Sequence, residues 1–354
     1  MNKQFAIGFF MHDDIKDNIN LLKVYNQILP GRIHDVHFAH YDNSILSSGR
    51  FINKTKPETM FSFIEQASDG PIRLTLLMNY LIEKDYDKVL TIFDEYYRAG
   101  LRSTVIADLE LIKRIKQKYP DVYIQGSCLS YRITEEELEE EAKEGVELHN
   151  PGVDIIRMPD QLKANHNAGF KQKVLFAEGC LHSCPHERKD HGHRWCIARG
   201  EHYKDPFICT NTVSSNVREF FTANWVTIQR LRQLEPYIEV IKLPRGHLSN
   251  AEQTVITGAP FSNIDKLLDF ITRYDNNLSH SVLEYNAVAY GPTLKEHLGY
   301  VDSTIFDDAF WRASDNCKMQ CEKRNCNVCY EYLRKIEMSQ PQGRTLRKRN
   351  IVKY

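Results

Sequence analysis

Short apolar runs alternate along the chain with longer segments in which apolar residues recur every three or four positions. Eight of the runs have the length of a β-strand, and they occupy residues 5–10, 36–40, 72–78, 104–107, 122–126, 154–158, 173–177 and 240–243. Strands that alternate with helices pair in parallel through βαβ units. Because eight such units close a barrel, the pattern predicts the α/β class and a (β/α)8 TIM-like barrel. A doubly wound open sheet is the alternative, since periodicity does not reveal closure.

The segments between these runs have the period and the end signals of helices. We expect helices at residues 15–28, 57–67, 86–98, 109–118 and 135–143, a longer one within 217–234, and a closing helix at 263–274. Thr134 and Glu137 have the spacing of a capping box, and Gly145 follows the same segment. The predicted barrel therefore accounts for residues 1–275.

Two further regions follow the predicted barrel. Residues 276–335 form a small cysteine-rich appendage, in which residues 330–335 have the pattern of the start of a helix. We interpret residues 336–354 as a flexible basic tail, because no acidic residue occurs from position 340 onward. The composition of this tail also suits a contact with RNA, which is the alternative interpretation.

The overall composition of the 354-residue chain is that of a globular protein, with 42% hydrophobic and 26% charged residues. The formal net charge of −1 does not call for nucleic acid or a membrane surface as a partner. No run of apolar residues is long enough to cross a bilayer, and the first residues lack the basic region and cleavage site of a signal peptide. We therefore expect a cytoplasmic protein without a membrane partner.

In a reducing compartment, clustered cysteines bind metal or carry redox chemistry more often than they form disulfides. Eight of the nine cysteines fall into two groups of four, and only Cys128 stands alone. The first quartet is Cys180, Cys184, Cys196 and Cys209, and the second is Cys317, Cys321, Cys326 and Cys329. Four thiolates hold either a 4Fe-4S cluster or a tetrahedral zinc ion.

The two quartets differ in spacing and position. The first follows the seventh predicted strand with open spacing, which favours an iron–sulfur cluster, whereas four histidines in the same loop suit zinc. The second is confined to 13 residues, a span that wraps one metal centre. It is interpreted as a second cluster for electron transfer or as a zinc site that stabilises the appendage.

Barrel enzymes place their active sites just after the C-terminal ends of the strands. Polar side chains follow nearly every predicted strand, although strand ends are often polar for structural reasons. The catalytic candidates are Asn79, Asp108, Glu178 and His186, and the candidate substrate contacts are His40, Arg50, Lys242 and Arg245. Glu178 and His186 suit proton transfer, and the two arginines suit a carboxylate or phosphate.

The segment EGCLHSCPHE, with Glu178, Cys180, Cys184 and Pro185, resembles the cysteine turn of the iron–sulfur barrel proteins grouped as peptidase family U-32. The segments YDNSILSSGR, LTLLMN and IEVIKLPRG are similar to that family's second, third and eighth strand regions. The resemblance implies a 4Fe-4S site completed by Cys196 and Cys209. The wide separation of these two cysteines departs from the family pattern, so His193 and Cys128 remain alternative fourth ligands.

The resemblance also implies a function. Members of the family are similar to oxygen-independent hydroxylation factors of quinone biosynthesis and to RNA-base hydroxylation enzymes. We therefore expect an iron–sulfur oxidoreductase that modifies a small molecule or an RNA base and receives electrons from a donor protein. The alternatives are a zinc-stabilised RNA-binding module without turnover and a peptidase or zinc hydrolase. The sequence contains neither a G-x-S-x-G elbow nor an H-E-x-x-H helix.

Overall fold

The computed structural model describes residues 3–9, 11–41, 46–47, 55–81, 85–177, 180–181, 212–213, 215–216, 218–243, 264–285, 298–315 and 317–340. Eight parallel strands form one sheet in the order β8-β7-β6-β4-β2-β1-β10-β9. They are β1 (Gln4–Gly8), β2 (Ile33–Ala39), β4 (Arg73–Met78), β6 (Ser103–Ile106), β7 (Tyr123–Gly126), β8 (Val146–Leu148), β9 (Lys173–Leu175) and β10 (Val240–Lys242). A short antiparallel pair, β3 (Leu46–Ser47) and β5 (Tyr80–Leu81), stands apart from this sheet.

The sheet closes on itself between its two end strands, β8 and β9. His149 and Gln172, which directly adjoin these strands, form a parallel bridge. The backbone N–H of His149 donates to the carbonyl of Lys171 (2.9 Å), and that of Lys173 donates to the carbonyl of His149 (2.7 Å). The fold is therefore a (β/α)8-type barrel of the α/β class, as predicted, and the open-sheet alternative is excluded.

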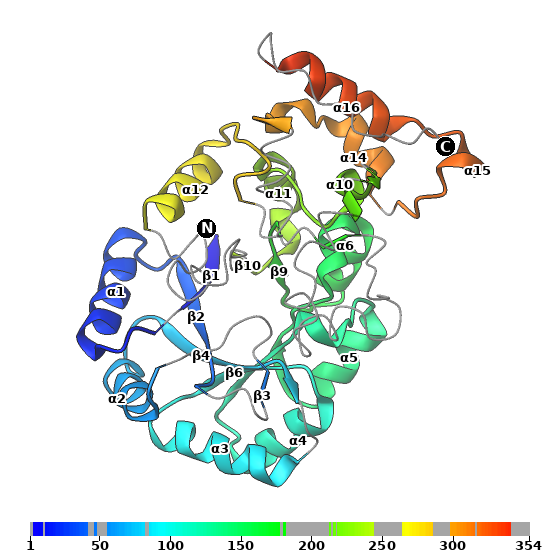
Figure 1. Ribbon diagram of the computed structural model, residues 1–354. Coiled ribbons are helices and arrows are strands. Elements are labelled where there is room, and N and C mark those ends of the chain that lie inside the picture. The colour runs from blue at the N-terminus through cyan, green and yellow to red at the C-terminus, as the bar shows by residue number, and fades with distance from the viewer. Residues whose placement is uncertain are drawn as a thin grey trace.

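Helices surround the strands in a ring (Figure 1). They are α1 (Ile15–Ile28), α2 (Pro57–Ala67), α3 (Tyr86–Arg98), α4 (Leu109–Lys118), α5 (Glu135–Lys143), α6 (Pro159–Asn167), α10 (Arg218–Thr222), α11 (Ile228–Leu234) and α12 (Ile264–Asn276). The first five have the predicted bounds. The capping box of α5 is present, because Thr134 Oγ1 accepts from the N–H of Glu137 (3.4 Å) and Glu137 Oε2 accepts from the N–H of Thr134 (2.9 Å).

Two predictions about local structure were wrong. The sixth strand is β8, and the predicted run at residues 154–158 forms a buried 3-10 helix, η2 (Val153–Arg157). The run is apolar because the turn packs into the core, whereas β8 has only three residues and an exposed Glu147. The long helix expected within residues 217–234 is broken into α10 and α11. The indole of Trp225 bonds back to the carbonyl of Phe220 (2.6 Å), and Thr227 caps α11.

The main hydrophobic core lies between the strands and the helices, and alternate residues of each strand point into it. On β4, Leu74, Leu76 and Met78 belong to this core. Thr75, between them, bonds to Ser103 Oγ inside the barrel (3.0 Å). This two-residue alternation leaves the barrel interior to a separate set of side chains, many of them polar.

The appendage contains the 3-10 helix η6 (Ser303–Ile305) and helices α14 (Asp308–Ser314), α15 (Cys321–Arg324) and α16 (Val328–Ser339), and it lies beside α10 and α11 (Figure 1). Its aromatic residues continue the barrel core, since the ring of Trp225 lies 5.1 Å from that of Phe306 and 5.9 Å from that of Trp311. Helix α16 continues to Ser339 with Ile336 fully buried, so residues 336–339 are helical and do not belong to the predicted tail. Residues 341–354 lie outside the described part of the chain.

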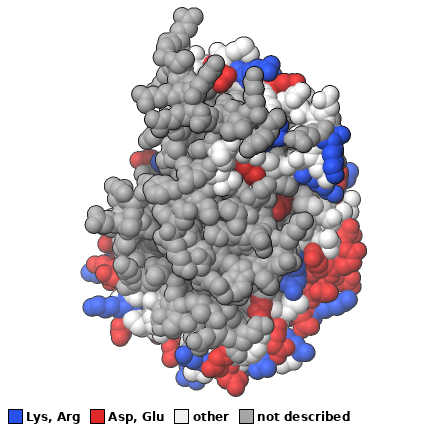
Figure 2. Space-filling model, turned by 45° about the vertical axis from the view of Figure 1, so that its right-hand side comes forward, with Lys and Arg blue, Asp and Glu red and all other residues white. Residues whose placement is uncertain are grey.

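Across the described residues, none of the helices is long and apolar enough to cross a membrane. Figure 2 shows many acidic side chains on one flank of the molecule. Helix α5 carries the exposed acidic residues Glu135, Glu136, Glu139 and Glu140.

Candidate functional site

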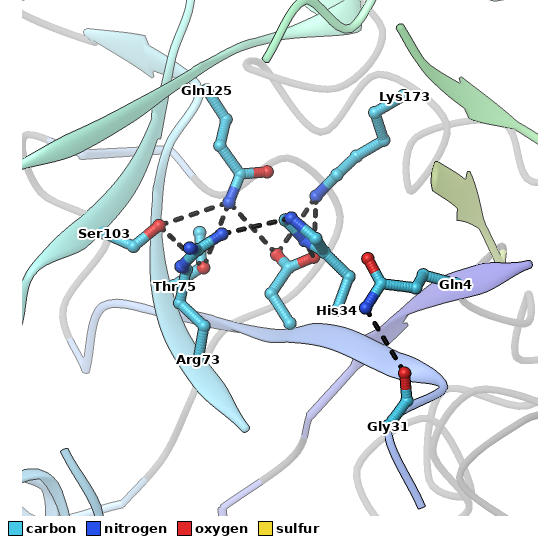
Figure 3. Close-up of polar contacts among 9 residues, drawn as sticks. Gln4, Gly31, His34, Arg73, Thr75, Ser103, Gln125 and Lys173 are labelled. Atoms are coloured by element: carbon cyan, nitrogen blue, oxygen red, sulfur yellow. Dashed lines mark hydrogen bonds and ion pairs between the residues drawn. The ribbon is translucent and has the colours of Figure 1, made fainter. Parts of the chain in front are cut away.

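A buried network of polar side chains crosses the interior of the barrel (Figure 3). Lys173 Nζ, from β9, lies 3.0 Å from each carboxylate oxygen of Asp35 on β2. Gln125 Nε2 lies within 3.4 Å of Asp35 Oδ2, Thr75 Oγ1 and Ser103 Oγ. Five strands are thereby joined through their inward-facing side chains, and the network holds the interior of the barrel in a single arrangement.

The charges of this network shift the pKa values of its two ionisable partners. Burial alone would raise the pKa of Asp35, but Lys173 foremost, followed by His34, holds it well below its usual value. Burial lowers the pKa of Lys173, Asp35 opposes that effect, and the nearby charge of Lys242 lowers it further. Lys242 ends β10 and is 9% exposed, so a second ammonium group lies inside the barrel.

The C-terminal mouth of the barrel, where we expected the active site, contains a second polar contact. Asn79, directly after β4, accepts a hydrogen bond at Oδ1 from Ser127 Oγ (2.9 Å), which directly follows β7. The Ser127 hydroxyl also accepts from the N–H of Leu129 (3.2 Å). Both side chains are buried, so Asn79 lies at the mouth as predicted and has a fixed orientation there.

Two cysteines belong to one small apolar cluster at this mouth. Cys180, which follows β9, and Cys128, which begins the 3-10 helix η1 (Cys128–Ser130) after β7, are 8% and 7% exposed. Both pack with Val153 and Leu175 in the same cluster. The structure therefore brings Cys128, the one cysteine outside the two quartets, next to Cys180 of the first quartet.

Asp108, a predicted catalytic residue, has a structural role in α4. Its Oδ1 accepts from the N–H of Leu111 (3.0 Å), which is the N-cap contact of the helix. The Tyr86 hydroxyl donates to the same carboxylate (3.3 Å). The polar residue that the pattern places at this strand end is thus accounted for by helix capping.

His40, a predicted substrate contact, lies behind the barrel wall. It is 3% exposed, and its Nδ1 lies 2.7 Å from the hydroxyl of Tyr96 on α3. Tyr96 in turn donates to Met60 Sδ on α2 (2.9 Å). The strand alternation directs His40 toward these helices, so the prediction of a substrate contact does not agree with its position.

The remaining candidates of the first site lie outside the described residues. They are Glu178, His186, Arg50, Arg245, Cys184, Cys196 and Cys209.

The second quartet lies at α15 and the start of α16. Burial, followed by the neighbouring Cys317, Cys321 and Cys326, raises the pKa of the Cys329 thiol to about 12. Burial also raises the pKa of Cys321, while Arg218 acts to lower it. In the described ranges, no three His, Cys, Asp or Glu side chains converge closely enough to hold a metal ion. The four thiols are neighbours, since the charges of Cys317, Cys321 and Cys326 act on Cys329.

Asp35 and Lys173 were not among the site residues predicted from the sequence. A signal for both was present, because each is a charged residue within or next to an apolar run of strand length. An ionisable group on the inward face of a barrel strand needs a buried partner of opposite charge. Two such residues of opposite charge, one acidic and one basic, can therefore be expected to pair.

No protein-family model matches the chain, and no curated protein sequence matches it. Similar solved structures include a U32 peptidase, with 11% identity, coverage of 68% of this chain and 92% of that chain, and a TM-score of 0.47. Another is 2,3-dimethylmalate lyase, a member of the PEP mutase/isocitrate lyase superfamily, with 11% identity, coverage of 95% and 93%, and a TM-score of 0.38. A third is a glycerophosphodiester phosphodiesterase from Parabacteroides distasonis, with 15% identity, coverage of 49% and 85%, and a TM-score of 0.36. Similarity at this level concerns the fold and not the activity.

Proposed function

We propose that this chain is a redox enzyme whose active site lies at the C-terminal mouth of the barrel and holds a 4Fe-4S cluster. The observation that carries the proposal is the burial of Cys180 beside Cys128 in one apolar cluster at that mouth. Barrel enzymes carry out their chemistry at this end.

The residues at the mouth suit such a group. Thiolates are the ligands of iron–sulfur clusters, and an apolar surround limits the access of water to them. Cys180, Cys184 and Cys196 would hold the cluster, with Cys209, His193 or Cys128 as the fourth ligand. When bound, the cluster supplies one-electron transfer, and a donor protein would provide the electrons.

The polar groups of the mouth would bind and orient the substrate. The Asn79 amide and the Ser127 hydroxyl already hold each other in place, so little ordering would be needed to present them to a ligand. Lys242 places an ammonium group inside the barrel, and its charge favours an anionic substrate. The substrate class that we propose is a small molecule or an RNA base, modified without molecular oxygen.

The experiment is metal analysis of the anaerobically purified full chain. Iron, acid-labile sulfide and zinc are measured together with the visible spectrum. About four irons and four sulfides per chain would support one cluster, and about eight of each would assign a second cluster to Cys317, Cys321, Cys326 and Cys329. Zinc alone, without a brown chromophore after anaerobic reconstitution, would refute the redox function and leave the zinc-stabilised module or a zinc hydrolase.

Variants connect the cluster to its ligands. Cys180→Ser is expected to lose the cluster of the first site and its absorbance. Cys128→Ser tests one of the three candidate fourth ligands, because it lowers the iron content only if Cys128 is a ligand. Cys321→Ser is the matched control, since it should leave the iron of the first site in place.

A further inference from the structure

A basin of about 650 Å³ opens at the N-terminal mouth of the barrel, opposite the proposed active site. Its polar lining comes from Arg73, Arg102, His34, Tyr123, Lys171 and Glu239. Along β4, Arg73 and Asn79 are separated by about 20 Å at 3.3 Å per residue. The basin and the C-terminal mouth are therefore two distinct places.

Small residues line part of the basin. Gly100, which lines the basin, has φ +103°, a conformation that other residues rarely adopt. A Cβ at this position would lie 3.0 Å from Ser68 Oγ, another lining atom. A larger residue at position 100 would therefore strain the backbone and crowd Ser68. Gly70 and Pro71 also line the basin.

The charge of the lining is positive. Arg102 is compensated by an ion pair with Asp121 (2.9 Å). Arg73 and Lys171 make no ion pair with a carboxylate in the part of the chain that the structure describes. Glu239 is the single acidic residue of the lining. Two cations without an acidic partner in one concave site attract an anion.

Arg73 is held in position from inside the barrel (Figure 3). Its NH1 lies 3.1 Å from His34 Nε2, and its guanidinium lies 4.0 Å from the centre of the Tyr123 ring. His34 Nδ1 lies 2.9 Å from Asp35 Oδ1. A proton on Nδ1 bonds to the carboxylate and leaves Nε2 to accept from Arg73. The buried Asp35–Lys173 pair thus fixes a guanidinium at the surface of the basin.

We propose that the N-terminal basin binds a small organic oxyanion, with a phosphate or carboxylate group on Arg73 and Lys171. A guanidinium has five N–H donors, and the bond to His34 uses one, so the fork remains able to meet an oxyanion. The volume of the basin is within the range of small-molecule sites. Because Arg73 is already oriented, little entropy is lost when the anion binds.

The N-terminal face of a barrel ordinarily serves stability, so the test must separate binding from folding. Isothermal titration calorimetry of the full chain with inorganic pyrophosphate and, separately, with citrate measures the affinity for a phosphate and for a carboxylate ligand. Arg73→Gln and Lys171→Gln are each expected to weaken the preferred probe at least about tenfold, the loss of one charge-assisted contact. Arg73→Lys keeps the charge without the fork and should lie between wild type and Arg73→Gln.

Arg114→Gln and Lys163→Gln are the controls, because each removes one arginine or lysine charge outside the basin, from helix α4 or α6. Their affinity for the probe should be within about twofold of the wild-type affinity. Melting temperatures show whether each variant is folded, and Lys171, an exposed side chain, can be replaced without disturbing the core. Saturable binding of pyrophosphate would identify a phosphate site, and binding of citrate alone would identify a carboxylate site. The proposal is overturned if wild type binds neither probe, or if Lys171→Gln binds as tightly as wild type.

Discussion

Lys173 donates to both carboxylate oxygens of Asp35 at 3.0 Å, and so joins two barrel strands, β9 and β2, that are not neighbours in the sheet. The side chains of both residues are at most 1% exposed. Forming a buried ion pair of this kind costs desolvation energy. Removing one partner lowers the stability of the fold strongly, because the other charge stays buried without a counter-charge.

Replacing Lys173 by Met should therefore lower the free energy of unfolding by about 3–5 kcal/mol, because the Asp35 carboxylate is left buried without its counter-charge. Urea denaturation at pH 7 measures the loss. Lys163→Met, on the exposed face of α6, is the matched control and should change stability by less than about 0.5 kcal/mol. Equal effects of the two substitutions would show that the buried pair does not contribute to stability.

The Asp35–Lys173 pair also predicts that the stabilities of the wild type and of Lys173→Met change in opposite directions with pH. In wild type the pKa of Asp35 is lowered, so its contribution to stability is present above the unfolded value of about 3.9 and decreases as the pH falls. In Lys173→Met, the ammonium group that opposes the effect of burial is absent, so burial raises the pKa of Asp35. Protonation of this carboxylate at low pH then removes the unpaired buried charge and makes the variant more stable. The stability difference between the two proteins should narrow below about pH 4 in urea titrations. A constant difference between pH 3 and 6 would contradict this assignment.

His280 in the appendage predicts a loss of stability in mild acid. Burial, followed by the charge of Arg273, lowers the pKa of His280 from 6.5 to about 4. Between these values the unfolded chain binds the proton and the folded chain does not, so stability falls with the pH by about 1.4 kcal/mol per unit. His280→Gln should flatten this slope in urea unfolding between pH 7 and 4. His166→Gln, at an exposed site on α6, should keep the wild-type slope.

Helix α5 depends on its N-terminal cap. Thr134→Ala removes the acceptor for the N–H of Glu137 and should cost about 1 kcal/mol. Thermal unfolding followed by circular dichroism measures the change. Thr91→Ala is the control, because Thr91 lies on the exposed side of α3 and bonds only within its own helix. A capping role is excluded if both variants melt together.

Arg157 ties the barrel to the appendage. Its guanidinium is buried, donates to the carbonyls of Phe221 (3.2 Å) and Trp225 (3.1 Å), and forms an ion pair with Asp315 (3.5 Å). Arg157→Leu should lower the free energy of unfolding by about 3 kcal/mol, because these acceptors lose a charged donor. Wild type should unfold in one transition, since the core is continuous across both parts.

The control for this variant is Arg312→Leu, at an exposed position of α14 in the same appendage. It should leave the free energy of unfolding within about 0.5 kcal/mol of the wild-type value. If Arg157→Leu is equally mild, Arg157 does not hold the appendage to the barrel.

The candidate site could be predicted only in part from sequence. Asn79 lies at the mouth because the end of an apolar strand places it there, and that end is visible in the chain. Asp108 and His40 satisfy the same pattern but serve a helix cap and a contact with Tyr96. The pattern gives the position of a residue along a strand, whereas the side of the barrel wall that it faces decides its role.

The sequence by itself determined the first five helices and the number of strands in the barrel. The bounds of α1 to α5 follow from local period and capping, which act over a few residues and need no tertiary partner. Only the tertiary structure decided which short segment becomes the sixth strand and that Asp35 meets Lys173. These two residues are 138 positions apart, and β8 has three residues, too few for a recognisable alternation. Closure of the barrel creates both features, because it brings distant strands together around an interior that a linear pattern does not contain.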